Sequence, residues 1–259
     1  MNKIKIIVMS VVVVAAVTVA AAINQGLLAQ RAYAQNAQTV ADLEAAIAAT
    51  EKKIQMINDR DEIANLIRVY GYYLDKNLWN NLADLFAREG SIELAQRGAY
   101  VGQDRVREFL FTAFGKEGPR PGAVSNHMNL QPVIHVAEDG MTAKSRHRLL
   151  MQMGRNGNGG TWGGGVYENE YVKEDGVWKF KKVHAYNTFM AAYDGGWAHA
   201  SSNRFPPRNE KFPPDLEPTA IFSAFPDIYD PPFHYDNPVT GRHEEPRGLI
   251  TQPENTATP

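Results

Sequence analysis

A tyrosine and an aspartate five residues apart are the first residues along the chain that could carry out chemistry. The segment 58–75 has apolar side chains at spacings of three and four, namely Ile63, Leu66, Ile67, Tyr70 and Leu74. This spacing predicts a helix with one apolar stripe that includes Tyr70. Asp75 lies at the edge of the stripe, about 120° round from Ile63 at ~100° per residue. Its carboxylate can tilt into a cavity that the stripe closes, or it can be a surface group in the last helical turn.

Two histidines share faces of predicted strands with apolar side chains. His147 alternates with Leu149, so we expect it to point inward as a core histidine or as an acid/base group. His184 alternates with Phe180 and Tyr186, which places all three on one predicted face. His184 is therefore either a buried structural group or a ligand contact.

No cofactor or metal site is predicted. Three histidines can hold catalytic zinc, and His127, His147 and His184 could in principle do so, but no local ligand spacing supports it. The glycine-rich segment 154–160 lacks the spacing and the following Lys-Ser/Thr of a phosphate loop, and its Asn-Gly chemistry predicts a hairpin instead. The chain has no cysteine, so thiol chemistry and disulfides are excluded.

The elements that must position these residues come as helices first and strands afterwards. Asp59 followed by Glu62 fits a capping box, which predicts that the first helix begins there. A short second helix to residue 86, a strand at 91–94 and a third helix capped by Asp104 follow. Four long strands are then predicted, at 125–136, 141–153, 161–173 and 177–193. This order predicts an α+β domain over 58–199, with helices packed on one face of a curved, mostly antiparallel sheet.

Both ends of the chain differ from this domain. Residues 1–34 have the layout of a secretory signal peptide, with an apolar run after Lys3 and Lys5 and small residues before Gln35. An uncleaved membrane anchor is the alternative, because the run approaches spanning length. Removal of the signal would leave a periplasmic or secreted protein with no membrane segment.

The segment 35–57 predicts a further helix with a partner. Apolar residues recur every seven positions, at Val40, Ile47 and Ile54. Three short heptads favour a helix that leans on another helix or on a second subunit. We therefore expect a homo-oligomer, either a dimer or a trimer.

Residues 200–259 carry twelve of the fifteen prolines and show no periodicity. They predict an extended arm, since the many aromatic side chains exceed what a solvated tail needs. A disordered tail is the alternative. The net charge of −2 gives no reason to expect a nucleic-acid partner.

Four pieces of the chain, in their order and spacing, resemble a known family. They are IANLIRVYGYYLDKNLWNNLADLF, YVGQDRVREFL, SNHMNLQPVIHV and GVWKFKKVHAYNTF. Residues 58–195 thereby resemble the SnoaL-like branch of the nuclear-transport-factor-2-like superfamily. The resemblance implies a cone-shaped α+β fold with a deep pocket between the sheet and the helices.

The resemblance also implies roles for individual residues. In the dehydratase and dehydrochlorinase members, an aspartate of the first helix orients a histidine that starts a long strand, and Asp75 and His127 match these places. Tyr70 precedes Asp75 by five residues, the spacing found in the bile-acid dehydratase. His147 stands near a second histidine of scytalone dehydratase, and Asn187 could match its last-strand polar residue.

A histidine tied to a carboxylate can act as a general base, and a nearby tyrosine can donate to an oxyanion or to a leaving group. We therefore expect a cofactor-independent lyase that abstracts a proton and eliminates water, or formaldehyde by retro-aldol cleavage, from an aromatic small molecule such as a lignin-derived diaryl compound. A non-catalytic ligand-binding or assembly module and an isomerase or cyclase are the alternatives. The expected ligand contacts are Tyr73, Trp79, Phe109, Trp162, Tyr167, His184, Tyr186 and Asn187.

Overall fold

The computed structural model describes residues 2–199 and 209–251, and the chain divides into two units, residues 1–55 and 56–259. The first unit consists of the N-terminal part of helix α1 (Asn2–Asp75). Its heptad residues Val40, Leu43, Ile47 and Ile54 are each more than half exposed. Among the described residues, no helical stretch combines the length and hydropathy that crossing a membrane requires.

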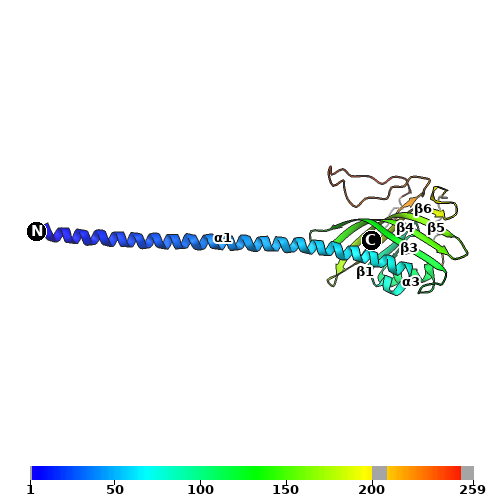
Figure 1. The fold of residues 1–259 in the computed structure, drawn as a ribbon, viewed down its shortest axis with the longest axis horizontal. Helices are drawn as coiled ribbons and strands as arrows, with labels where there is room; N and C mark the ends of the chain where they lie inside the picture. The colour runs from blue at the N-terminus through cyan, green and yellow to red at the C-terminus, as the bar shows by residue number, and fades with distance from the viewer. Residues whose placement is uncertain (1, 200–208, 252–259) are drawn as a thin grey trace. The chain divides into compact units, whose positions relative to one another are not determined.

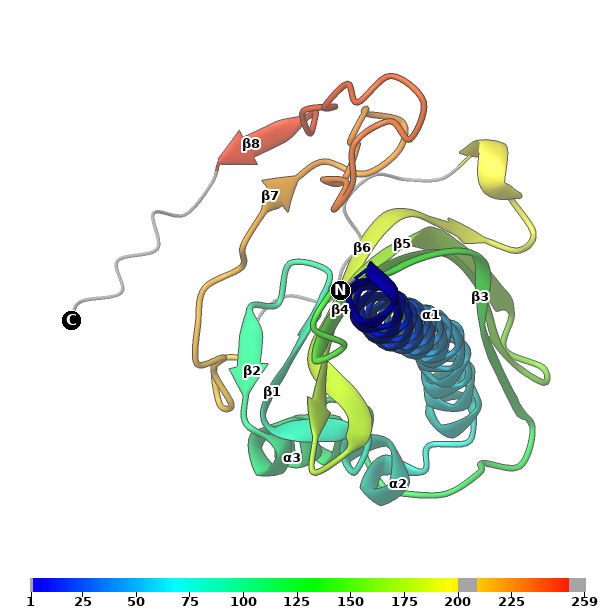
Figure 2. The same cartoon turned by 90° about the vertical axis from the view of Figure 1, so that its left-hand side faces the viewer.

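The second unit is a curved, unclosed sheet of six strands with helices over it (Figures 1 and 2). The strands run in the order β2-β1-β6-β5-β4-β3, with β1 and β6 parallel and the other neighbours antiparallel. The predicted α+β class is therefore confirmed. The bounds are α2 (Trp79–Ala83), β1 (Phe86–Leu94), β2 (Ala99–Val101), α3 (Gln103–Phe114), β3 (Ala123–Val136), β4 (Thr142–Arg155), β5 (Gly160–Glu174), β6 (Val177–Ala192), a 3-10 turn (Trp197–His199), β7 (Ile221–Phe222) and β8 (Leu249–Thr251).

The apolar stripe of the last part of α1 packs into the concave side of the sheet. Ile63, Ile67, Tyr70 and Leu74 are at most 7% exposed and belong to one core with Phe180 of β6. Burial of this apolar stripe removes its side chains from water, and this hydrophobic effect is the main driving force for docking the helix on the sheet. Docking fixes the position of Asp75, one residue beyond the stripe.

A glycine lets this helix approach the edge strand closely. A Cβ atom at Gly71 would lie 2.8 Å from Nδ2 of Asn129 and 3.0 Å from the carbonyl oxygen of His127. Both distances are below normal contact, so a larger residue requires the Asn129 side chain to move and the β3 backbone at His127 to shift. Gly71 lies one helical turn before Asp75 and so governs how near that carboxylate comes to β3.

Two predicted helix starts are wrong. Helix α1 continues through Asp59, whose buried carboxylate accepts hydrogen bonds from Lys173 (2.6 Å) and from the indole of Trp178 (2.9 Å). Helix α3 begins after Gly102 without a side-chain cap, so Asp104 lies in its first turn instead of capping it. An N-cap residue must have a non-helical backbone conformation, whereas Asp59 and Asp104 both lie inside a helix.

A β-bulge reverses the predicted faces of β6. Glu170 pairs with Lys182 but Tyr171 pairs with Phe180, so one residue of β6 is left over. Since side chains alternate along a strand, one extra residue moves every later side chain to the other face. The expectation that His184 shares a face with Phe180 is therefore wrong.

The segment 209–251 lies along the convex face of the sheet. Thr219 donates from its main-chain N–H and its hydroxyl to the buried carboxylate of Glu93, each at 2.7 Å. Phe222 and Tyr229 stack at 3.8 Å and pack with Tyr186 of β6 in a second small apolar cluster. The rest of the predicted arm, residues 200–208 and 252–259, falls outside the described residues.

Candidate functional site

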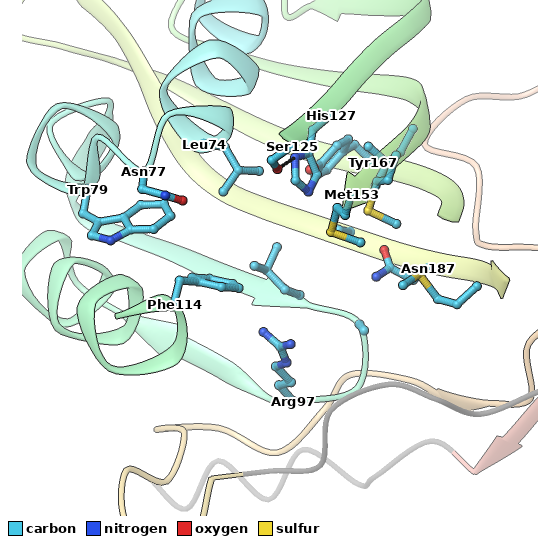
Figure 3. Close-up of a pocket in the computed structure, with 16 residues that line it drawn as sticks. Leu74, Asn77, Trp79, Arg97, Phe114, Ser125, His127, Met153, Tyr167 and Asn187 are labelled. Atoms are coloured by element: carbon cyan, nitrogen blue, oxygen red, sulfur yellow. Dashed lines mark hydrogen bonds between the residues drawn. The ribbon is translucent and has the colours of Figure 1, made fainter. Parts of the chain in front are cut away.

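A cavity of about 270 Å³ lies between the end of α1, the β1–β2 turn and the concave side of the sheet (Figure 3). Most of its wall is apolar, formed by Leu74, Leu94, Phe114, Leu149, Met151, Met153 and Met190. A few polar side chains also reach it, namely Asn77, Arg97, Ser125, His127, Tyr167 and Asn187. An apolar hollow with a few convergent polar groups is typical of a small-molecule site.

The imidazole of His127 in this wall is held by Asp75. The Nδ1 atom of His127 lies 2.8 Å from Oδ1 of Asp75, and the main-chain N–H of His127 donates to the same oxygen at 2.8 Å. Both side chains are nearly buried, at 14% and 13% exposed. Because a carboxylate only accepts, Nδ1 donates the proton in this contact, and in a neutral ring the lone pair is then on Nε2. Nε2 has no hydrogen bond within the part of the chain that the structure describes.

The predicted catalytic tyrosine lies behind the cavity wall. Tyr70 is fully buried and does not line the cavity, and its hydroxyl has no hydrogen-bond partner of normal geometry among the described residues. Tyr167 of β5 lies edge-on against it, with ring centroids 6.0 Å apart, and does line the cavity. Burial, then the Tyr70 side chain and the Asp75 carboxylate, raise the pKa of Tyr167, so its phenol stays protonated and can donate a hydrogen bond.

His147 is buried on the concave side but does not line the cavity. Its Nε2 lies 2.8 Å from the hydroxyl of Ser145, which in turn lies 2.7 Å from the hydroxyl of Tyr171. Burial, with smaller effects of Arg68 and His234, lowers the pKa of His147 to about 4. The inward direction expected from alternation is confirmed, and the side chain is a neutral member of a buried polar chain.

The predicted ligand contacts divide into two groups. Those that line the cavity are Trp79, Tyr167 and Asn187; those that do not are Tyr73, Phe109, Trp162, His184 and Tyr186. Phe109 instead stacks on Tyr100 in the core at 4.1 Å, and the bulge turns His184 and Tyr186 toward the convex face. Within the described residues, no group of three or more His, Asp or Glu side chains is placed to hold a metal ion.

Several cavity residues were not singled out from the sequence. Met151 and Met153 continue the alternation of His147 along β4, so the pattern contained a signal for them. Arg97 follows β1 in a tight turn, where no periodicity distinguishes it. Ser125, 3.4 Å from Nδ1 of His127, begins the predicted strand 125–136, but a serine at a strand end carries no functional signal by itself.

The chain was compared with family models and with known proteins and solved structures. The SnoaL-like domain family matches residues 55–184. A solved structure named provisionally as a scytalone dehydratase, from Novosphingobium aromaticivorans, is 24% identical, with 54% of this chain and 91% of that chain covered and a TM-score of 0.46. The dehydrochlorinase LinA-type3 from Novosphingobium barchaimii is 19% identical, with 56% and 96% covered and a TM-score of 0.48.

No curated protein matches the chain. The matched family region nevertheless takes in half of the chain, including the end of α1, the edge strand β3 and the first half of β6. The chain belongs to the SnoaL-like domain family.

Proposed function

We propose that this protein is a lyase that uses His127 as a general base on an aromatic small molecule in the cavity. The observation that carries the proposal is the hydrogen bond between Nδ1 of His127 and Asp75, which leaves Nε2 as a basic lone pair in an apolar wall. The family and the mostly apolar cavity support small-molecule lyase or isomerase chemistry at this place.

The proposed reaction requires only proton transfers and bond cleavage within the substrate. Nε2 of His127 takes a proton from a carbon of the substrate, the electron pair forms a double bond, and the neighbouring carbon–oxygen bond breaks. The leaving hydroxide takes the proton back from the imidazolium and departs as water. In the retro-aldol form, Nε2 takes the hydroxyl proton of a hydroxymethyl group, the carbon–carbon bond breaks to release formaldehyde, and the carbanion takes the proton back from the imidazolium.

Asp75 and Tyr167 would stabilise the charges that develop on the imidazole and on the substrate during the reaction. The Asp75 carboxylate stabilises the imidazolium while it holds the ring in place. In this proposal the oxyanion donor is Tyr167 in place of Tyr70, because Tyr167 is the tyrosine in the cavity wall. The raised pKa of Tyr167 suits hydrogen-bond donation better than full proton transfer.

The test is a screen of aromatic diols and hydroxylated polycycles with detection of products by mass spectrometry. A lyase yields a product lighter by the mass of water or of formaldehyde, whereas an isomerase or cyclase leaves the mass unchanged. His127→Ala is expected to lose turnover and to retain ligand binding. A bound ligand that the wild-type protein never converts would favour the non-catalytic binding module.

We further propose that the protein is exported and that residues 1–34 are removed. When the protein is expressed with residues 1–34, the chain recovered from the periplasm or the medium should have the intact mass of a protein that begins at Gln35. A full-length chain in the membrane fraction would instead indicate an uncleaved anchor.

A further inference from the structure

Arg97 places a positive charge in the wall of the apolar cavity, and no acidic side chain in the described part of the chain pairs with it. Its guanidinium lies 5.5 Å from the centroid of the Phe114 ring, and among the described residues it makes neither an ion pair nor a hydrogen bond. Burial lowers the pKa of Arg97. Withdrawing a cation from water is unfavourable unless something compensates it, and a negatively charged ligand group in the cavity would do so.

The turn that carries Arg97 is fixed on both sides by the segment 209–251. The side chain of Gln96 donates to the carbonyl of Phe222 at 2.7 Å and accepts from its N–H at 3.3 Å. The main chain of Ala99 exchanges hydrogen bonds with Leu216 at 2.9 and 3.2 Å. These four bonds hold the backbone around Arg97 in advance of any ligand, as a preorganised binding group requires.

Arg97 and the proposed base His127 lie at different ends of the cavity, so ligand binding and proton abstraction can take place at separate points. Figure 3 shows Arg97 on one side of the cavity and His127 on the other, with Asn187 on the sheet beside them. The buried Oδ1 atom of Asn187 has no partner among the described residues and can accept from a hydroxyl group. An elongated ligand can therefore touch both ends of the cavity.

We propose that Arg97 anchors a carboxylate of the substrate at the end of the cavity opposite His127. The proposal deepens the proposed function: the substrate class becomes an aromatic acid whose reacting carbon lies away from the carboxylate. A guanidinium forms two parallel hydrogen bonds to a carboxylate, and in an apolar wall this pairing fixes orientation as well as affinity.

The test is binding of biphenyl-4-carboxylate and biphenyl-4-carboxamide to the full protein by calorimetry near pH 7. We expect the carboxylate to bind at least about tenfold more tightly than the amide, because a charge-assisted hydrogen bond is roughly twice as strong as a neutral one. Arg97→Met should abolish this preference while the amide still binds measurably, which also shows that the variant is folded. Arg97→Lys should retain part of the preference, and Arg148→Met, which removes an exposed charge from β4, should retain all of it.

Equal affinity of the wild-type protein for acid and amide, no measurable binding of the acid, or an equal loss in Arg148→Met would overturn the proposal. His127→Ala must keep the preference, because the anchor does not depend on the base. If no substrate is ever converted but the preference follows Arg97, the lyase proposal fails and the carboxylate anchor stands.

Discussion

One carboxylate oxygen of Asp75 accepts two hydrogen bonds from His127, one from the ring Nδ1 and one from the main-chain N–H, each at 2.8 Å. The ring of His127 is thus tied to the same atom as its own backbone. This arrangement fixes the tautomer and the orientation of the imidazole before a ligand binds. Because 52 residues separate the two in sequence, the pairing depends on how α1 docks against β3.

Asp75→Asn should reduce turnover by about 10²–10⁴-fold with little change in ligand affinity, since an amide can hold the ring but cannot stabilise the imidazolium. Steady-state kinetics and calorimetry on the same substrate measure the two effects. Asp84→Asn is the matched control, because Asp84 is an exposed carboxylate paired with Arg107 outside the cavity. Full turnover in Asp75→Asn would remove the carboxylate from the mechanism.

Gly71→Ala should lower both stability and turnover. In a helix this change ordinarily stabilises by ~0.5–1 kcal/mol, but here the new Cβ would crowd Asn129 and the His127 carbonyl. We expect a net destabilisation of about 1–3 kcal/mol and a weakened Asp75–His127 contact. Thermal unfolding and kinetics measure both, with Gly195→Ala as the control at an open site. A more stable Gly71→Ala variant would show that the close approach is not needed.

Tyr167→Phe and Tyr70→Phe should differ sharply. Loss of the Tyr167 hydroxyl removes the proposed oxyanion donor, with an expected fall in kcat of about 10²–10³-fold. The Tyr70 hydroxyl is buried against the Tyr167 side chain and does not line the cavity, so its loss should change kcat much less than the loss of the Tyr167 hydroxyl does. Kinetics and calorimetric melting of both variants make the comparison. A fall in kcat in Tyr70→Phe as large as in Tyr167→Phe would return the donor role to Tyr70.

Stability should fall as the pH drops below about 6.5, the value at which histidines of the unfolded chain take up protons. In the folded protein burial lowers the pKa of His147 to about 4 and the pKa of His184 well below its usual value. Between about pH 6.5 and about pH 4 the unfolded chain therefore binds more protons than the folded protein. The stability that depends on neutral His147, of the order of 3 kcal/mol, is fully present above about pH 6.5 and is lost as the pH falls to about 4. Burial raises the pKa of Glu93, which acts in the opposite sense.

Urea unfolding between pH 4 and pH 7 measures this dependence. His147→Gln should flatten the acid side of the profile, whereas His199→Gln, at an exposed position, should leave it unchanged. An identical acid slope in His147→Gln and the wild-type protein would contradict the assignment.

The N-terminal helix should mediate self-association. Leu43 and Ile47 are 59% and 58% exposed and belong to the heptad stripe of the segment 35–57. Apolar heptad positions pair helices, so we expect a dimer or trimer that Leu43→Lys with Ile47→Lys dissociates. Analytical ultracentrifugation measures the mass, and Glu44→Lys is the control on an adjacent position. A wild-type monomer at micromolar concentration would refute this prediction.

Local pattern was enough for much of the fold. The stripe through Tyr70 and Leu74, the hairpin at 154–160 and the inward direction of His147 all follow from residue type and spacing. These features depend on which side of a helix or strand is apolar, and that information is carried by neighbours within a few residues.

The sequence by itself determined an α+β domain with an aspartate at the edge of a buried helical stripe. Only the tertiary structure decided that the carboxylate meets His127, that Tyr167 and not Tyr70 lines the cavity, and that Arg97 enters it with no ion pair to any described residue. It also decided the face of His184, through a single extra residue in β6. The reason is that cavities, bulges and close approaches arise where distant segments meet, and their geometry depends on packing that no local periodicity encodes.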